Sequence, residues 1–581
     1  MSTPDQEPGL LQRAADWAAQ DPDPRTRAQL EALCGKVRGG DDAALAELED
    51  RFSSFLAFGT AGLRAELGPG PNRMNSMVVR RTAAGIGRFL LAKADGSYTP
   101  KAVIGFDARH NSDVFADESA AVLSAAGIEV QLLPTALPTP VLAWAVRELS
   151  AEAGIMVTAS HNPPADNGYK VYLGGRVETT WGQGAQIVSP VDAQIAAQID
   201  HDEPIAGIAL VKEGWEVLPG AGEAGDIEGA YLRAISCVVP PAMGAGGDDL
   251  AAAREKLRIV LTPMHGVGGH TISLALGSAG FSRVRLVAEQ AEPDPDFPTV
   301  SFPNPEEPGA LDLALELATK TDADLIIAND PDADRCAAAV KFPDTGWRML
   351  RGDEVGWLLG ARCAENAATG AVLANSIVSS RMLASIASAH SLAHENTLTG
   401  FKWISRVPNL AFGYEEALGY CVAPGLVRDK DGISAGLLLA DYAAELTAAG
   451  SSLPAVLDQL ALDHGLHQTD QLSVRVTDLA RLDTMMRSLR ATPPAMLGGE
   501  PVAELEDLSL GANLPPTDGM LFLTEANTRV IIRPSGTEPK LKCYLEAIAP
   551  VATAGDLPAA RLAATKQLER IKGELASLLQ G

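Results

Sequence analysis

The chain has 581 residues, of which 46% are hydrophobic and 5% aromatic, as in an ordinary α/β protein. Its 47 basic and 74 acidic residues give a formal net charge of −27, which argues against binding to nucleic acids or anionic membranes because both repel an acidic surface. The length exceeds what one hydrophobic core supports and predicts roughly three to four domains.

The cysteines and the chain start indicate a cellular compartment. The six cysteines are scattered and form no C-x-x-C pair, so neither a zinc site nor a disulfide framework is expected, and a reducing cytosol fits. The first residues are acidic and lack a basic segment followed by an apolar core, and no apolar run approaches bilayer length. We therefore expect neither a signal peptide nor a transmembrane helix, and a cytoplasmic protein.

The first half of the chain predicts helices and then alternating strands and helices. Residues 1 to about 50 predict amphipathic helices, broken at residues 21–24 by two Asp-Pro pairs. Apolar runs at residues 102–106, 128–133 and 154–157 alternate with helical patterns at 113–126 and 140–149. Strands that alternate with helices predict βαβ units and a mainly parallel sheet.

Two further α/β blocks follow a loop-rich stretch around residues 204–225. Strands are expected at 258–261, 284–288 and 325–328 with a helix at 269–279. The third block has these expected elements: helices at 353–366, 381–389 and 433–446, and strands at 371–374 and 410–412.

The last block differs, because its strands follow one another. Strands are expected at residues 472–476, 520–523, 530–532 and 541–547, flanked by helices at 478–489 and 559–579. This order predicts an α+β domain with an antiparallel sheet. The expected segments are residues 1–50 (helical extension), 51–215, 216–345 and 346–465 (α/β domains) and 466–581 (α+β domain).

Ser160 is the candidate nucleophile. It follows a predicted strand in Thr158-Ala159-Ser160-His161-Asn162-Pro163, where the prolines prevent helix formation and a loop tip is expected to expose the hydroxyl. A simple turn former is the alternative. Lys170 lies on the strand expected to return from this loop, where it either points back at the same site or is solvated.

Asp330, Asp332 and Asp334 are candidate metal ligands. Three carboxylates at alternate positions of one loop suit Mg²⁺ or Ca²⁺. An EF-hand is excluded, because Arg335 and Lys341 stand where it needs Gly and Glu. The adjacent Arg335 fits a phosphate bound beside the metal. A purely structural carboxylate cluster is the alternative.

A third motif has the composition of a phosphate-binding loop. Residues 533–537 follow a strand and supply a guanidinium, two hydroxyls and a glycine that allows close backbone approach, and Lys540 and Lys542 add positive charge. A surface turn is the alternative. A serine able to carry a phosphoryl group, a divalent metal and a second phosphate grip together are what a phosphosugar mutase needs.

Three further sequence features indicate candidate site residues, but less specifically. Glu415 and Glu416 follow a predicted strand and could bind sugar hydroxyls or work as acid or base; the start of a helix is the alternative. Lys430 lies in a mixed-charge turn, and Arg64 follows glycines that could approach an anion. Residues 266–269 lack the spacing of a dinucleotide site, and no P-loop motif occurs.

These motifs, in this order, resemble the α-D-phosphohexomutase superfamily, which contains the phosphoglucomutases and phosphomannomutases. The resemblance is collinear from about Phe58 to Tyr544, and residues 58–64, 399–404 and 413–420 resemble the branch with phosphopentomutases and glucose-1,6-bisphosphate synthases. It implies an α/β fold of four domains around a central cleft. Three domains would be related, with mixed and largely parallel sheets, and the C-terminal one α+β.

The resemblance also implies roles for individual residues. Ser160 would be the phosphoserine and, with Asp330, Asp332 and Asp334, a metal ligand. The implied catalytic and substrate-binding residues are Ser160, Lys170, Arg335, Arg64 and Lys430, and Thr399, Gly400, Glu415, Glu416, Arg533, Ser535, Gly536, Thr537 and Lys540. Many relatives have Glu-x-Ser where this chain has Glu415-Glu416-Ala417, and some have histidine at the position of Gly419.

The function implied is the interconversion of hexose 1-phosphate and 6-phosphate, with glucose and/or mannose as the sugar. A phosphoserine enzyme, a bisphosphorylated sugar intermediate, Mg²⁺ and a sugar 1,6-bisphosphate activator go with it. The alternatives are a phosphopentomutase acting on ribose or deoxyribose 1-phosphate and a phosphoserine-dependent sugar phosphatase. The expected partners are small sugar phosphates, without nucleic acid or membrane, and the expected state is a monomer or weak dimer.

Overall fold

The computed structural model describes residues 7–59, 62–241, 247–476, 479–535 and 540–580. The chain forms two compact units. Unit 1 comprises Met1–Pro241, Arg258–Cys336 and Gly425–Leu437, and unit 2 comprises Ala242–Leu257, Ala337–Pro424 and Leu438–Gly581. The segment boundaries expected from the sequence stay predictions.

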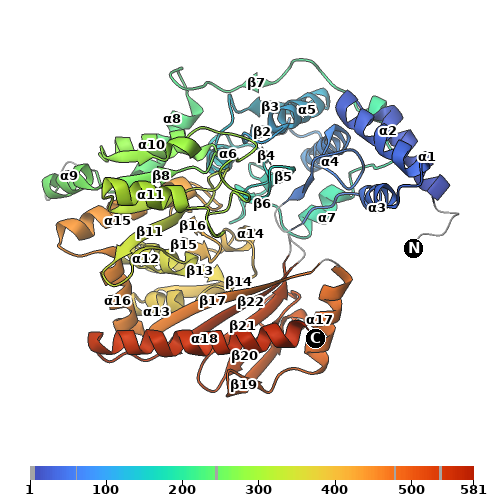
Figure 1. Cartoon of the computed structure of the whole chain (residues 1–581). Helices are drawn as coiled ribbons and strands as arrows, with labels where there is room; N and C mark the ends of the chain where they lie inside the picture. Colours follow the sequence, from blue (N-terminus) through green and yellow to red (C-terminus); the bar gives the residue numbers. More distant parts are fainter. Residues whose placement is uncertain (1–6, 60–61, 242–246, 477–478, 536–539, 581) are drawn as a thin grey trace. The chain divides into compact units, whose positions relative to one another are not determined.

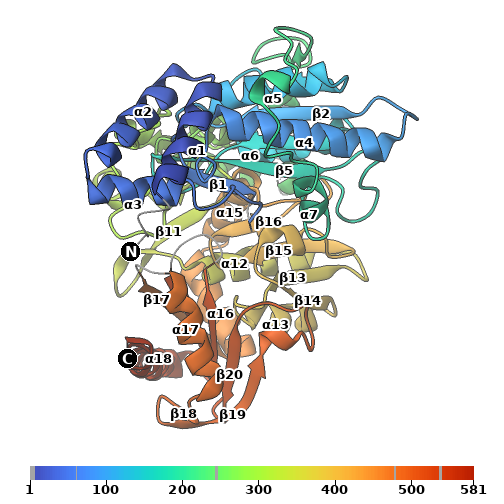
Figure 2. The same ribbon diagram turned by 90° about the vertical axis from the view of Figure 1, so that its right-hand side faces the viewer.

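Unit 1 begins with three helices, as predicted: α1 (Glu7–Gln20), α2 (Pro24–Arg38) and α3 (Asp42–Arg51). Asp23 caps α2 by accepting from the Arg25 N–H, and Pro24 stands in the first turn, where it lacks an N–H that would otherwise need a partner. The three helices lie side by side (Figures 1 and 2). Their apolar faces share one buried cluster with residues of α4 (Ser76–Ala94), including Met77 and Val78.

The first sheet carries the serine loop. Its strand order is β1-β5-β4-β2-β3-β7, with β6 on β5. Strand β2 pairs in parallel with β3 and β4, whereas β5 is antiparallel to both β4 and β1. The strands are β1 (Leu63–Glu66), β2 (Lys101–Phe106), β3 (Glu129–Leu132), β4 (Ala153–Val157), β5 (Asp166–Leu173), β6 (Ala185–Gln186) and β7 (Glu216–Val217). All five residues of β4 are buried, as expected of a central strand covered on both faces.

Helices α5 (Ser112–Ala125), α6 (Thr139–Glu148) and α7 (Val191–Ala196) accompany this sheet. The rest of unit 1 contains three parallel strands in the order β10-β8-β9. Its elements are α8 (Ile227–Ile235), β8 (Ile259–Thr262), α10 (Gly268–Ser278), β9 (Val284–Leu286), α11 (Asp312–Thr321) and β10 (Leu325–Ala328). The mainly parallel α/β pattern predicted for these two blocks is confirmed.

Unit 2 contains a hairpin and a four-stranded sheet. Strands β11 (Ala337–Phe342) and β12 (Gly346–Met349) pair antiparallel. The sheet has the order β14-β13-β15-β16, with β13 parallel to both neighbours. The other elements are α9 (Gly247–Lys256), α12 (Gly352–Glu365), β13 (Val372–Ser376), α13 (Met382–Ala389), β14 (Ala393–Thr397), α14 (Phe401–Ile404), β15 (Leu410–Glu415), β16 (Gly419–Cys421) and α16 (Leu453–His464). Helix α15 (Gly432–Ala448) begins in unit 1 and ends in unit 2.

The C-terminal part of unit 2 is the predicted antiparallel sheet, in the order β17-β22-β21-β20-β19-β18. Helix α18 (Leu557–Gln580) runs across this sheet (Figure 1) and buries Leu568, Ile571 and Leu575 against it. The strands and the second helix are β17 (Leu466–Arg475), β18 (Met496–Leu497), β19 (Glu500–Asp507), β20 (Met520–Thr524), β21 (Arg529–Pro534), β22 (Lys540–Ala549) and α17 (Leu479–Ala491).

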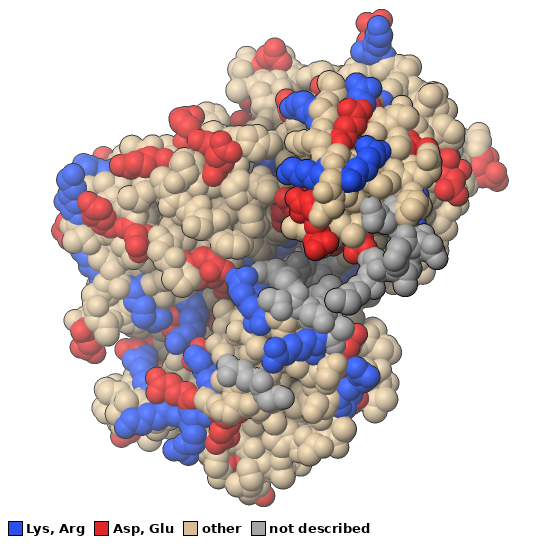
Figure 3. Space-filling view, turned by 45° about the vertical axis from the view of Figure 1, so that its right-hand side comes forward, with Lys and Arg blue, Asp and Glu red and all other residues tan. Residues whose placement is uncertain are grey.

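In the described part of the chain, no helix combines the length and the apolar character needed to cross a bilayer. Basic and acidic side chains are interspersed on the face shown in Figure 3, with neutral residues between them. On that face the charges of both signs are therefore mixed rather than gathered in one block of a single sign.

Candidate active site

Ser160 lies in the loop that follows β4, and the expectation of an exposed hydroxyl is wrong. The residue is 3% exposed, and its Oγ donates a 2.8 Å hydrogen bond to Asp330 Oδ2. The backbone is left-handed at Ser160, with φ 52°, and its N–H donates to Thr158 Oγ1. The hydroxyl is buried because the loop turns inward to a carboxylate partner that lies 170 residues further along the chain.

The three aspartates form a buried cluster after β10. Asp330, Asp332 and Asp334 are at most 1% exposed, and each offers a carboxylate oxygen within 4.8 Å of the others. Within the part of the chain that the structure describes, Asp332 Oδ1 and Asp334 Oδ1 have no hydrogen-bond partner, which is costly for buried polar atoms. Burial, together with the two neighbouring carboxylates, raises the pKa of Asp330 well above its usual value. A hard divalent cation would neutralise this charge and fill the unmet coordination, so the residues fit a metal ion.

Lys170 reaches this cluster from β5. It is 2% exposed, and its Nζ donates to Asp332 Oδ2 and Asp334 Oδ2, both at 2.7 Å. Burial lowers its pKa, but the two carboxylates outweigh that effect and hold the pKa above the usual lysine value. Of the two alternatives from the sequence, the solvated strand lysine is therefore wrong.

Lys430 approaches the Asp334 carboxylate from the turn that precedes α15, with its Nζ 3.3 Å from Asp334 Oδ2. Burial raises the pKa of Asp334, but Lys170, Lys430 and Arg335 together bring it below the usual range. The flanking aspartates are also fixed: Tyr172 Oη donates to Asp429 Oδ2 at 2.7 Å, and Tyr231 Oη donates to Asp431 Oδ1 at 2.8 Å. Two buried tyrosines thus hold the turn that carries Lys430.

Two arginines that were predicted to be catalytic lie beside the serine loop (residues 158–166) and the loop of the three aspartates (the metal loop, residues 330–335). The Arg335 N–H donates to Asp330 Oδ1 at 3.1 Å, and its Nε lies 3.7 Å from Asp330 Oδ2. Arg64 Nη1 donates to Asn162 Oδ1 in the serine loop. Burial lowers the pKa of Arg64, and the negative charge of Asp332 raises it. Both guanidinium groups therefore belong to the same cluster of charges as Ser160.

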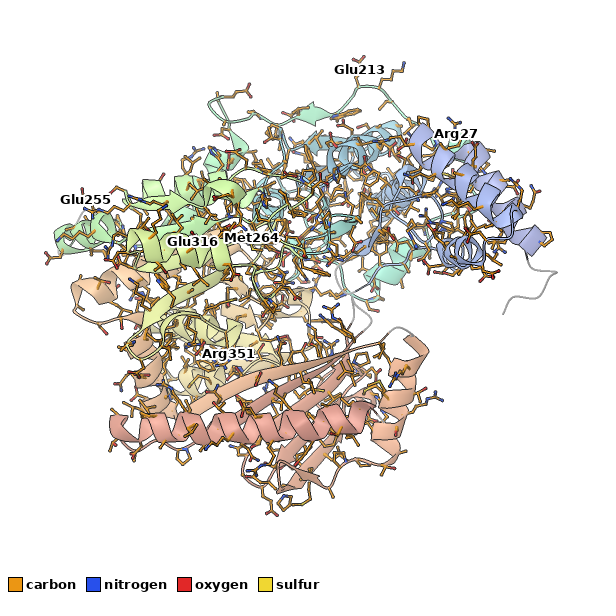
Figure 4. The ribbon with its side chains drawn as sticks, viewed as in Figure 1. Arg27, Glu213, Glu255, Met264, Glu316 and Arg351 are labelled. Carbon is orange, nitrogen blue, oxygen red and sulfur yellow. The ribbon has the colours of Figure 1, made fainter. Side chains whose placement is uncertain are left out.

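Glycines let a second loop pack beneath the metal loop. A Cβ on Gly266 would lie 2.3 Å from Pro331 Cα, and one on Gly268 would lie 2.6 Å from Ala333 Cβ. The neighbouring Met264 and His265 both have left-handed backbones. Met264, which belongs to unit 1, is labelled in Figure 4. Gly266 and Gly268 therefore allow this segment to pack closely against the loop of the three aspartates.

The expected sugar-binding residues lie in unit 2. Glu415 ends β15 and is followed by a turn into β16, so the alternative of a helix start is wrong. The Glu416 carboxylate accepts from Ser376 Oγ at 3.1 Å and from Ser379 Oγ at 2.9 Å. Thr399 and Gly400 precede α14, and Gly400 has φ 105°, which a residue with a Cβ rarely adopts.

The expected phosphate loop connects β21 and β22. Arg533 pairs with Lys542 across these strands, and the Ser535 N–H donates to the Lys540 carbonyl at 2.8 Å. Among the described residues, the buried Nε of Arg533 has no hydrogen-bond partner. Gly536 and Thr537, also predicted to bind phosphate, lie outside the described residues.

Four family models match the chain in sequence order. They are described as Phosphoglucomutase/phosphomannomutase alpha/beta/alpha domains I, II and III and C-terminal domain, and they match residues 56–205, 248–342, 351–461 and 473–574. The chain belongs to the phosphoglucomutase/phosphomannomutase family. The predicted α-D-phosphohexomutase resemblance and the four-domain α/β fold are thereby confirmed, and the chain is an intramolecular phosphotransferase.

Several relatives support this membership. A Haemophilus influenzae protein named "Probable phosphomannomutase" is 43% identical over 477 residues, covering 82% of this chain and 93% of the relative. The phosphopentomutase of Homo sapiens is 34% identical over 588 residues, covering 93% and 92%. A phosphoglucomutase of Staphylococcus epidermidis is 32% identical over 526 residues, covering 86% and 92%. A family protein from Burkholderia thailandensis shares the fold, with a TM-score of 0.62 at 20% identity over 88% of this chain and 97% of that one.

In this mutase of the phosphohexomutase superfamily, the buried aspartates fit the Mg²⁺ dependence of the family. Asp107 and Arg109 were missed from the sequence, although the structure places them against the serine loop. The sequence feature that could have revealed them is Asp-x-Arg directly after β2. Because β2 and β4 are parallel neighbours, the residues that follow β2 lie at the same sheet edge as the serine loop that follows β4.

Proposed function

We propose that the enzyme interconverts hexose 1-phosphate and hexose 6-phosphate, with glucose and/or mannose as the sugar, through phosphorylated Ser160. The observation that carries the proposal is the buried contact between Ser160 Oγ and Asp330 Oδ2, within a cluster of three carboxylates, two lysines and two arginines. This cluster combines an oxygen nucleophile with enough positive charge to hold a phosphoryl group.

In the proposed reaction, a hydroxyl oxygen of the sugar phosphate attacks the phosphorus on Ser160. The bond from phosphorus to Ser160 Oγ breaks, the bond to the sugar oxygen forms, and the hydroxyl proton leaves to the protein. The bisphosphorylated sugar then returns its other phosphoryl group to Ser160. Mg²⁺, bound by Asp330, Asp332, Asp334 and the serine, would supply charge neutralisation at the phosphoryl oxygens.

The chain's own residues would position the groups and stabilise their charge. Arg335 and Arg64 are proposed to bind the phosphoryl oxygens, and the Nζ atoms of Lys170 and Lys430 to donate or accept the sugar hydroxyl proton. Thr399, Gly400, Glu415 and Glu416 are proposed to bind the sugar. Arg533, Ser535, Gly536, Thr537 and Lys540 are proposed to hold the phosphate that does not react. Positioning and electrostatics supply most of the rate in phosphoryl transfer.

A pentose 1-/5-phosphate mutase is the second candidate. It is supported by the 34% identity to phosphopentomutase over 93% of this chain. The sugar bisphosphate activator, the cytoplasmic location and the monomeric or weakly dimeric state are further proposals that rest on the sequence.

The test is a turnover assay with glucose, mannose, ribose and deoxyribose 1-phosphates, each with its bisphosphate. We expect the hexose phosphates to turn over fastest, mass spectrometry to find one phosphate on the Ser160 peptide, and excess EDTA to stop turnover. Ser160→Ala should abolish both the phosphopeptide and activity, whereas Ser273→Ala, in helix α10, should change neither. Faster pentose turnover would favour the second candidate, and steady release of free phosphate would indicate a phosphatase.

The distal phosphate grip has its own test. Losing a charge-assisted contact costs about 1.5–3 kcal/mol, so Arg533→Ala should raise KM by about tenfold or more. It should also increase dependence on added bisphosphate, because each escape of the intermediate leaves Ser160 unphosphorylated. Arg487→Ala, at an exposed position of α17, is the control. An unchanged KM and activator requirement in Arg533→Ala would remove the main argument for a mutase over a phosphatase.

A further inference from the structure

We propose that Arg109, held in place by Asp107, is a positioning residue that fixes the serine loop, residues 158–166, so that Ser160 Oγ faces the metal loop. The inference rests on the proposed role of Ser160 and adds to it a residue that no sequence motif assigned. Arg109 follows β2 and is 1% exposed at its side chain.

The guanidinium of Arg109 binds four backbone carbonyls of this one loop. Its Nη2 donates to the carbonyls of Ser160 at 2.7 Å and Asn162 at 2.6 Å. Its Nη1 donates to the carbonyls of Pro163 at 2.8 Å and Asp166 at 3.2 Å. The four N–H groups of the terminal nitrogens therefore match four acceptors, and none is left to contact a substrate.

This convergence explains why the loop keeps an unfavourable backbone. A left-handed backbone is unfavourable for a residue with a Cβ, and Ser160 has φ 52°. Four carbonyls that point at one place would repel one another without a cation between them. Such a conformation persists only where the surrounding contacts stabilise it, and here the hydrogen bonds of Arg109 do so.

Arg109 is itself fixed at the exit of β2. Asp107 Oδ1 accepts from the Arg109 N–H at 3.0 Å and from Ser112 Oγ at 2.7 Å, and Asp107 Oδ2 lies 3.5 Å from Arg109 Nε. The Asp107 N–H donates to the Val157 carbonyl at the end of β4, so the two strand exits are linked directly. The ring of Phe297 covers the guanidinium at 4.9 Å.

The Arg109→Lys variant tests whether Arg109 acts by positioning the loop or only by its positive charge. An ammonium keeps the charge but cannot span four carbonyls in the geometry of a planar fork. We expect kcat and the rate of Ser160 phosphorylation by sugar bisphosphate each to fall about 100-fold, as for a misplaced reacting group, with KM nearly unchanged. Arg81→Lys is the matched control, because buried Arg81 donates to the Glu203 carbonyl, away from the serine loop, and should behave as wild type.

Guanidinium rescue adds a readout that a general loss of stability would not give. In Arg109→Ala, guanidinium chloride well below unfolding concentrations should restore part of kcat, and it should not do so in Arg81→Ala. Wild-type kinetics in Arg109→Lys, or a failure of rescue in folded Arg109→Ala, would overturn the inference. If neither variant folds, Phe297→Leu removes the ring that covers the guanidinium, and the inference then requires a lower kcat at unchanged KM. A wild-type enzyme that never phosphorylates Ser160 would instead overturn the proposed function.

Discussion

At the residue scale, buried charge in this enzyme is tolerated only where a partner compensates it. Lys170 keeps its charge because two carboxylates lie 2.7 Å from its Nζ, and Glu546, which contacts Arg529 and Arg381, has its pKa lowered despite burial. Among the described residues, no cation donates a hydrogen bond to Asp353, in the first turn of α12. Its Oδ1 accepts from the Ser380 N–H and Tyr414 Oη, and burial raises its pKa to about 7.

This shift predicts a pH-dependent stability. The pKa of Asp353 is about 7 when folded and near 3.8 when unfolded, so its contribution to stability falls as pH rises from about 4 to about 7. Asp353→Asn keeps both accepted hydrogen bonds without the charge. It should therefore increase the free energy of unfolding of unit 2 progressively across that window, by up to ~4 kcal/mol above pH 7. The melting temperature of unit 2 should rise with it.

Differential scanning calorimetry between pH 5 and pH 8 measures this effect. Asp483→Asn, at an exposed position of α17, is the control for losing one negative charge. A difference between Asp353→Asn and wild type that does not grow with pH would show that Asp353 is not a buried acid of raised pKa.

At the scale of elements, the active site depends on loops that pack so closely that a glycine Cβ would not fit between them. Gly432 begins α15 and lies on the metal loop, where its N–H donates to the Ala333 carbonyl. A Cβ there would come within 2.1 Å of the Arg335 carbonyl oxygen. The turn that carries Lys430 is thereby held against the loop that carries the aspartates.

Gly432→Ala should consequently separate these two loops. We expect turnover to fall about 100-fold, since a shift of about 1 Å in a reacting group has such an effect, and stability to fall by ~1–3 kcal/mol from overpacking. Gly277→Ala is the matched control, because among the described residues no atom beyond its chain neighbours and its own helix backbone lies within 4 Å of the added Cβ, and alanine favours helix α10. Kinetics and urea unfolding of both variants check this, and normal turnover in Gly432→Ala would contradict the close contact.

The elements also show what the sequence could predict. Strands such as β4 were predictable because a run buried on both faces is continuously apolar. Helix α4 was not predicted, since it is buried on most faces and buries polar residues such as Arg81 and Thr82 with its apolar ones. Strand β19 was not predicted because its residues are largely polar and exposed. The burial of Ser160 was unpredictable for another reason: its partner Asp330 is remote in sequence, and local patterns carry no information on such contacts.

At the scale of the whole molecule, the aspartate cluster, the serine and both lysines belong to unit 1, whereas the expected sugar and phosphate contacts belong to unit 2. A ligand that binds only the folded state stabilises it by about 2.7 kcal/mol at 100 times its Kd. Mg²⁺ should therefore protect unit 1 selectively against local opening.

Hydrogen exchange of the enzyme with and without Mg²⁺ tests this division. Peptides from residues 158–173, 325–335 and 428–436 should exchange more slowly with Mg²⁺, because the cation removes the repulsion among Asp330, Asp332 and Asp334 that favours opening. The sheet of strands β17 to β22 should be unaffected. Asp332→Asn should weaken the protection, since one ligand charge is lost, and equal protection of both units would place the dominant ion site elsewhere.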